Sequence, residues 1–282
     1  SGENWNRSKE KNKKKFGKGF FTKKPFSCNI RIRMEDEKMD QEKVLKLQEM
    51  IDDSHRIVFF GGAGVSTESN IPDFRSTDGL YNQTYKYPPE VMVSHTFYIQ
   101  HTEEFYEFYK NKMLFLDAKP NKAHKKLAEL EKAGKLTAVV TQNIDGLHQK
   151  AGSHKVYELH GSVHRNYCVK CHKFFDAEYV AAADGVPHCD ACGGVIKPDV
   201  VLYEESLDGN VMQGAINAIA GADMLIIGGT SLVVYPAAGM IDYFRGKYLV
   251  VLNRDATSRD KQADLCITDP IGEVLGQIKV NK

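Results

Sequence analysis

A short apolar run leads directly into a glycine turn in the stretch that governs the fold, Ile57-Val58-Phe59-Phe60-Gly61-Gly62-Ala63-Gly64-Val65-Ser66-Thr67. Four apolar residues bounded by glycine are typical of a strand buried on both faces of a parallel sheet. Small residues let the backbone approach a phosphate group, and the N-terminus of a following helix favours negative charge. The stretch therefore predicts a phosphate-binding turn, although a plain β–α turn also requires glycine.

Similar apolar runs recur along the chain and alternate with amphipathic helices. Helical spacing places Val44, Leu47 and Ile51 on one face, and further helices are predicted at 121–133, before Gly134, and at 210–220. Further strands are predicted at Leu136–Val140, Val156–Leu159, Asp199–Leu202, Met224–Ile227 and Tyr248–Leu252. This alternation predicts an α/β fold with a Rossmann-like parallel sheet and helices on both faces.

Two regions interrupt that alternation. Residues 79–118 are rich in aromatic side chains at helical spacing, and residues 166–197 contain paired cysteines. Both are expected to leave the sheet and to form together a smaller lobe, a helical insert joined to a metal module. The prediction is one domain over 40–282, with the Rossmann-like lobe at 40–78, 119–165 and 198–282.

The N-terminal segment differs sharply in charge from the remainder. Residues 1–33 contain eleven Lys or Arg against two Glu, a net charge of +9, which leaves −8 for the remainder of a chain whose total is +1. Its few apolar residues cannot bury enough surface to fold. We expect residues 1–39 to be a basic, disordered leader, or tag and upstream sequence; an anion-binding arm and a transit peptide are the alternatives.

Composition excludes several classes of protein. The 282 residues are 42% hydrophobic and 27% charged, as in globular domains, and no apolar stretch approaches the roughly 20 residues that span a bilayer. The mildly acidic main body shows no nucleic-acid-binding surface. Without a secretory signal, six cysteines indicate a reducing, cytoplasmic compartment.

Four of those cysteines have the spacing of a zinc site. Cys168-x-x-Cys171 and Cys189-x-x-Cys192 are separated by 17 residues. Two thiolates three positions apart on a tight turn can bind one tetrahedral ion from the same side. Four cysteines leave no open position on zinc, so the predicted site is structural, and His172 and His188 are surplus to it.

Longer motifs identify the family that the chain resembles. The glycine turn continues to Arg75, and three more motifs follow in order: Thr141-Gln142-Asn143-Ile144-Asp145-Gly146-Leu147-His148, His160-Gly161-Ser162 and Gly229-Thr230-Ser231-Leu232. With the cysteine pairs and Asn253, this set closely resembles the sirtuins, the NAD-dependent protein deacylases, over about residues 40–280. The family usually has glycine where this chain has Asn70, a residue that tolerates left-handed backbone geometry. No acidic residue closes a second strand after the turn, which argues against a dehydrogenase.

The resemblance implies an NAD pocket built from residues that follow several strands. It assigns the nicotinamide carboxamide to Ile144 and Asp145, the shielding of the reactive carbon to Phe74, and the ordering of the loop and phosphates to Arg75. The remaining implied NAD contacts are Ala63 and Thr67 at the phosphate turn, Gln142 and Asn143 at the nearby ribose, Thr230 and Ser231 at the adenosine half, Asn253 at its ribose, and Ile271.

His160 and Asn143 are the predicted catalytic residues. A strand-end histidine alone is more often a structural hydrogen-bonding group, but among these motifs His160 is predicted to be the general base. The resemblance implies that the acyl-lysine oxygen attacks the ribose C1′ as nicotinamide leaves, and that His160 then activates the 2′-hydroxyl. Free lysine and O-acyl-ADP-ribose are the implied products. His148 is expected to support the site indirectly or to pack beside Asp145.

The substrate is expected to be an acyl-lysine peptide, bound as an extended strand between the lobes by Val200–Tyr203 and Gly229–Val233. Relatives that prefer acidic acyl groups carry Tyr-x-x-Arg, and the nearest match here, Tyr106-Glu107-Phe108-Tyr109, lacks the arginine. We therefore expect a bacterial-type enzyme that prefers acetyl or another uncharged acyl group. An ADP-ribosyltransferase and a non-catalytic NAD-binding module are the alternative hypotheses.

Overall fold

The computed structural model describes residues 39–73 and 86–280. These residues belong to one compact unit, Met39–Lys282. Nearly all of the predicted leader, together with Cys28, Phe74 and Arg75, lies outside the described residues. No helix among the described residues is long and apolar enough to cross a membrane.

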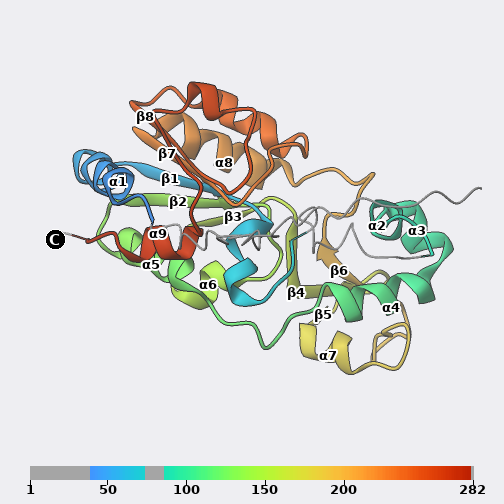
Figure 1. The fold of residues 1–282 in the computed structure, drawn as a ribbon. Helices are drawn as coiled ribbons and strands as arrows, with labels where there is room; N and C mark the ends of the chain where they lie inside the picture. Colours follow the sequence, from blue (N-terminus) through green and yellow to red (C-terminus); the bar gives the residue numbers. More distant parts are fainter. Residues whose placement is uncertain (1–38, 74–85, 281–282) are drawn as a thin grey trace, which may run out of the picture. The chain divides into compact units, whose positions relative to one another are not determined.

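Six parallel strands form the main sheet (Figure 1). Their spatial order is β3 (Val156–Glu158), β2 (Leu136–Thr141), β1 (Ile57–Gly61), β7 (Met224–Gly228), β8 (Tyr248–Leu252) and β9 (Leu265–Ile267). The chain moves outward in one direction from β1 and in the other from β7. Open parallel sheets bind ligands at the carboxyl ends of strands where the order reverses, which here is the edge beside β1 and β7.

Alternating side chains of the strands face two separate cores. Phe59 packs with α1 (Gln41–Asp53), α5 (Lys122–Lys132) and α9 (Ile271–Gly276), whereas Phe60 packs with α8 (Gly209–Gly221) and the 3-10 helix η4 (Ala237–Tyr243). Figure 1 shows α8 on the side of the sheet opposite to α5 and α9. The prediction of a parallel sheet covered on both faces is confirmed.

Local signals position the helices that hold the site. Asn121 caps α5 by accepting hydrogen bonds from the backbone N–H groups of Ala123 and His124, and the His124 side chain accepts from the backbone of Asn121. Gly134 follows α5 with a φ of 74°, the left-handed geometry that glycine adopts without steric cost. The helix therefore begins and ends one residue inside the predicted range 121–133, whose end residues are its caps.

The smaller lobe combines the helical insert and the cysteine module in one core, as predicted. Its antiparallel sheet has the order β5 (Phe174–Phe175), β4 (Gly161–Cys168), β6 (Ile196–Val200), with α7 (Ala177–Ala182) beside it. The insert contributes α2 (Pro89–Met92), α3 (His95–Gln100) and α4 (Thr102–Lys112). Aromatic side chains of α3 and α4 pack against Val163, Phe175 and Ile196 of the small sheet.

Three predictions about elements were wrong or incomplete. Asp199–Leu202 is no parallel strand, because β6 ends at Val200 and pairs antiparallel with β4. β6 also crosses the predicted lobe boundary between 197 and 198, and the lobe boundaries themselves stay a prediction. The glycine turn leads into two 3-10 turns, η1 (Ala63–Val65) and η2 (Thr67–Ser69), and not into an α-helix.

Candidate active site and metal centre

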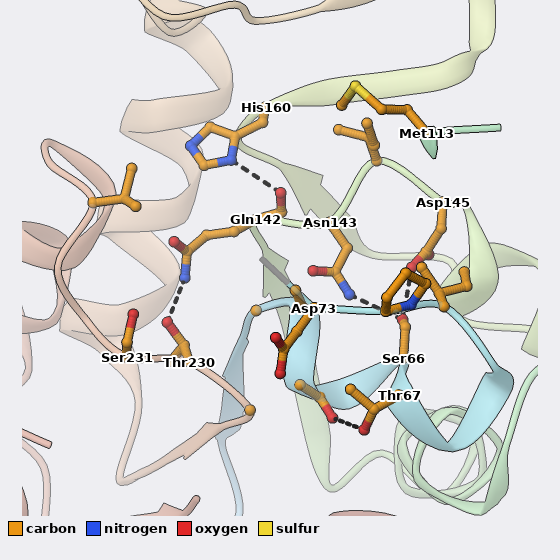
Figure 2. A pocket seen from close by; sticks show the side chains of 18 of the residues that line it. Ser66, Thr67, Asp73, Met113, Gln142, Asn143, Asp145, His160, Thr230 and Ser231 are labelled. Carbon is orange, nitrogen blue, oxygen red and sulfur yellow. Dashed lines mark hydrogen bonds between the residues drawn. The ribbon is translucent and has the colours of Figure 1, made fainter. Parts of the chain in front are cut away.

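A cavity of about 420 Å³ lies at the carboxyl edge of the main sheet and extends to the small lobe. It is lined by both predicted catalytic residues and by every predicted NAD contact that the structure describes (Figure 2). These residues are Ala63, Thr67, Gln142, Asn143, Ile144, Asp145, His160, Thr230, Ser231, Asn253 and Ile271. Phe74 and Arg75 lie outside the described residues, so their roles stay predictions.

The glycines of the turn are required because two loops touch at the floor of this cavity. A Cβ atom on Gly64 would lie 2.8 Å from the Cα of Gly229, and one on Gly62 would lie 2.8 Å from the Cβ of Thr230. Gly64 donates its N–H to the Gly229 carbonyl at 2.9 Å. Asn70 ends the turn with a φ of 62°, the left-handed geometry expected of it. At the strand ends the backbone of the turn, with no side chain in the way, can therefore approach a ligand closely.

Ser66 joins the two predicted nicotinamide-side residues and was missed by the sequence analysis. Its hydroxyl donates to a carboxylate oxygen of Asp145 at 2.6 Å and accepts from the Nδ2 of Asn143 at 3.0 Å, as Figure 2 shows. Asn143 also donates its backbone N–H to Thr141 Oγ1 at 3.0 Å. A small hydroxyl residue inside the glycine motif was the only available signal, and it did not reveal the partner.

Gln142 links Thr230, a predicted adenosine contact, to His160. Its Nε2 donates to Thr230 Oγ1 at 3.0 Å, and its backbone carbonyl lies 2.9 Å from His160 Nδ1. A carbonyl oxygen can only accept a hydrogen bond, so Nδ1 carries the proton and Nε2 carries a lone pair. The imidazole is thereby held in the tautomer that can act as a base.

The surroundings of His160 favour its neutral form. Burial lowers the pKa of His160 below its ordinary value, while the hydrogen bond to Gln142 raises it by a smaller amount. The adjacent Gly161 has a φ of 75°, and a Cβ there would lie 1.9 Å from the Asp199 carbonyl oxygen. Only glycine allows β4 to begin directly after His160 and so close to β6.

A pair of buried histidines lies beneath the Asp145 loop. The ring centres of His124 and His148 are 4.7 Å apart, and His148 also lies beside Phe59. Neither ring nitrogen of His148 has a hydrogen-bond partner among the described residues. Burial lowers the pKa of both side chains, so both are neutral near pH 7. His148 therefore packs in the core behind the site.

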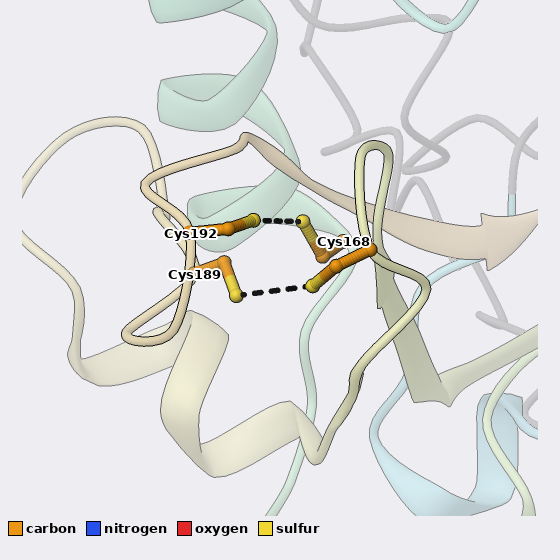
Figure 3. Close-up of side chains that lie close together, drawn as sticks. Cys168, Cys189 and Cys192 are labelled. Atoms are coloured by element: carbon orange, nitrogen blue, oxygen red, sulfur yellow. Dashed lines mark hydrogen bonds between the residues drawn. The ribbon is translucent and has the colours of Figure 1, made fainter.

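Four thiols come together at the end of the small sheet (Figure 3). All four sulfur atoms lie within 4.8 Å of one another, with Cys168 Sγ 3.4 Å from Cys192 Sγ and Cys171 Sγ 3.6 Å from Cys189 Sγ. Tetrahedral zinc with Zn–S bonds of about 2.3 Å separates its thiolates by about 3.8 Å. The residues fit one zinc ion, which would cross-link β4 to the turn before β6 and leave no ligand position open.

One wall of the cavity carries a cation that was not among the predicted site residues. Lys112, the last residue of α4, lines the cavity together with Met113 and Phe115, which follow the helix. Tyr106 and Tyr109, from the motif compared with Tyr-x-x-Arg, are instead fully buried in the small-lobe core. Neither tyrosine lines the cavity.

Comparison with known proteins agrees with this geometry. A family model of the Sir2 family matches residues 62–236. An NAD-dependent protein deacetylase of Clostridium acetobutylicum is 62% identical over 237 residues, which are 83% of this chain and 97% of that protein.

Two solved structures of Sir2 proteins, each 40% identical, are also similar. One holds a deacetylated p53 peptide and 3′-O-acetyl-ADP-ribose (TM-score 0.76, covering 83% of this chain and 96% of that chain). The other holds a p53 peptide and NAD (TM-score 0.73, covering 83% and 95%). The match over most of the chain confirms the predicted resemblance, and this protein belongs to the Sir2 family.

Proposed function

We propose that this protein is an NAD-dependent protein-lysine deacetylase that transfers the acyl group to ADP-ribose and releases nicotinamide. One observation carries the proposal: a neutral His160, fixed with its proton on Nδ1, lines the same cavity as the Asn143–Ser66–Asp145 network and the glycine turn. The name of the Clostridium acetobutylicum relative and the ligands of the two Sir2 structures support the same activity.

His160 would remove a proton from a ribose hydroxyl once nicotinamide has left. Its Nε2 lone pair can accept this proton, and the Gln142 carbonyl stabilises the imidazolium that results. Because the pKa of His160 is lowered by burial, the base is already deprotonated at pH 7. His160 therefore does not have to lose a proton before it can act as the base.

The nicotinamide half would be held by Ile144 and Asp145, with Asn143 next to the ribose. Ser66 holds both polar side chains in place through its two hydrogen bonds. The phosphates would lie over Ala63 and Thr67, and the adenosine half at Thr230, Ser231, Asn253 and Ile271, all of which line the cavity. Phe74 and Arg75 complete this proposed set.

The acyl-lysine would enter on an extended peptide that adds as a strand. Val200–Tyr203 and the segment after β7 both line the cavity. Among the described residues, the carbonyl of Val201 and both backbone polar groups of Val233 have no hydrogen-bond partner. Unpaired backbone groups on two facing segments are what strand addition requires. Acetyl is the proposed acyl group, and another Sir2 structure holds a propionylated peptide.

The deciding experiment is incubation with NAD and a matched panel of acetyl-, propionyl- and succinyl-lysine peptides, analysed by mass spectrometry. Deacetylation with equimolar nicotinamide and O-acetyl-ADP-ribose supports the proposal. A gain of ADP-ribose on protein without deacetylation would instead establish a transferase. Binding of NAD without nicotinamide release, with any acyl peptide, would establish a non-catalytic module.

The zinc ion would be held by the four cysteines and would stabilise the small lobe without touching the reacting atoms. We also propose a reducing, cytoplasmic location, since the four clustered thiols are free and positioned for metal. Fractionation of the native cells tests the location.

A further inference from the structure

A second cavity, of about 380 Å³, opens between the helical insert and the segment after β6. We call it the side pocket and define it by six of its lining residues, Tyr87, Glu90, Phe97, His101, Tyr203 and Glu204. None of the NAD-binding or catalytic residues proposed above lines it. Its role is therefore separate from the chemistry.

The side pocket adjoins the proposed peptide cleft. Tyr203 and Glu204 line both cavities. Tyr203 pairs through its backbone with the start of α3, donating to the Val93 carbonyl at 3.0 Å and accepting from His95 N–H at 3.0 Å. A peptide that adds along Val200–Tyr203 would pass beside the side pocket, because Tyr203, at the end of that segment, lines both cavities.

The side pocket combines a carboxylate pair with aromatic rings. Glu204 Oε2 accepts from Thr96 N–H at 2.9 Å and Thr96 Oγ1 at 2.7 Å, which lowers the pKa of Glu204 and keeps it ionised. The other oxygen of Glu204 has no hydrogen-bond partner among the described residues. Glu90 is exposed on the same pocket.

The rings form a stacked group beside these carboxylates. The ring centres of Phe97 and His101 are 4.8 Å apart with an interplanar angle of 26°, and the Tyr87 ring meets Phe97 edge-on at 5.2 Å. Lys86 Nζ lies 5.1 Å from the centre of the Tyr87 ring, so this ring already receives one cation from the chain itself. No Lys or Arg is among the described residues that line the pocket.

Tyr203 is the exposed ring of the side pocket, and Tyr87 and His101 are half-buried. Carboxylates next to such accessible rings attract a cation on a long apolar stem. We propose that the side pocket binds a Lys or Arg side chain of the substrate polypeptide, flanking the acyl-lysine, and so selects acetylation sites in basic sequence. This inference rests on the proposed deacetylase function. It adds a specificity determinant to that function and assigns a use to the helical insert beyond core packing.

The test uses the intact protein with NAD and one acetyl-lysine peptide whose flanks are otherwise uncharged. A single Arg, or a single Glu, is moved through each flanking position, and kcat/KM is measured from nicotinamide release. Binding of the same peptides is measured in parallel by fluorescence anisotropy. Glu90→Lys is the pocket variant, and Glu103→Lys, an exposed charge reversal on α4 outside the pocket, is its matched control.

We expect Arg at one or two adjacent positions to raise kcat/KM roughly three- to tenfold, the size of an exposed ion pair combined with a cation–π contact. Glu90→Lys should remove this gain and leave kcat/KM for the uncharged peptide unchanged. Glu103→Lys should keep the gain. No preferred position in the wild type, or equal losses in both variants, would overturn the proposal. If peptides bind with the Arg preference but none is deacetylated, the deacetylase proposal fails and the side pocket stands as a peptide site.

Discussion

Replacing His124 by glutamine should remove one defined part of the acid sensitivity of the fold. The side chain is fully buried at the third position of α5, where Nδ1 accepts the Asn121 N–H at 3.3 Å. Glutamine at that position can supply the same cap contact without titrating. Burial lowers the pKa of His124 from 6.5 to about 4, although Asp145 partly opposes the shift. The variant therefore isolates the cost of charging this ring.

The sign and size follow from linkage. The unfolded chain binds a proton near pH 6.5, and the folded chain does so only near pH 4. The contribution of neutral His124 to the free energy of unfolding is thus fully present above pH 6.5 and is lost as the pH falls toward about 4. At 1.36 kcal/mol per pH unit, the full loss is about 3 kcal/mol, and about 2 kcal/mol is already lost at pH 5. For a domain of this size, the latter lowers Tm by about 4–8 °C.

Urea unfolding of wild type, His124→Gln and His154→Gln at pH 8 and pH 5 measures the effect. His154 is exposed, so its variant controls for the loss of any histidine. Acid also weakens zinc binding, but it does so equally in all three proteins. We expect His124→Gln to lose about 2 kcal/mol less than the other two between these pH values. Equal losses in all three proteins would refute the reasoning.

The remaining predictions concern catalysis and the metal. His160→Ala should reduce kcat by about 10²–10⁴-fold while NAD binding, measured by calorimetry, is retained; more than a few per cent of residual activity would contradict the base assignment. Because the pKa of His160 is lowered, the acid limb of kcat/KM should lie below pH 6.5. An acid limb of kcat/KM at or above pH 6.5 would contradict a lowered pKa of His160. Ser66→Ala, which removes two buried hydrogen bonds, should lower kcat/KM roughly 10- to 100-fold without lowering Tm by more than a few degrees. Cys189→Ala or chelation should expose the small lobe to proteolysis, and active protein that contains no zinc by metal analysis would contradict a structural ion.

Short-range patterns were enough to predict most of the framework. The strand Ile57–Gly61 and the turn after it depend on residues that are neighbours in the sequence. The Cys-x-x-Cys spacing of the cysteine pairs is local in the same way. Periodicity also identified α1, α5 and α8, because the apolar spacing of a helix is visible within one window of sequence. The strand predicted at Asp199–Leu202 was misplaced because the apolar run that suggested it lies mostly after β6, whose own sequence, Ile196–Val200, includes Lys197, Pro198 and Asp199.

Contacts between distant residues lay beyond the reach of sequence patterns. Ser66 and Asp145 are separated by 79 positions, and only the folding of two strand ends onto one edge of the sheet brings them to 2.6 Å. The burial that makes His160 and His124 neutral is likewise a property of surrounding elements and not of their neighbours in the chain.

The amino-acid sequence alone was thus sufficient to predict the fold class, the cluster of four cysteines and the described residues that line the main cavity, since each depends on local spacing or on the order of motifs along the chain. The protonation states, the Ser66 bridge and the side pocket beside Tyr203 emerged only in three dimensions. Desolvation, hydrogen-bond partners and cavity walls are all set by groups that become neighbours only when the chain has folded.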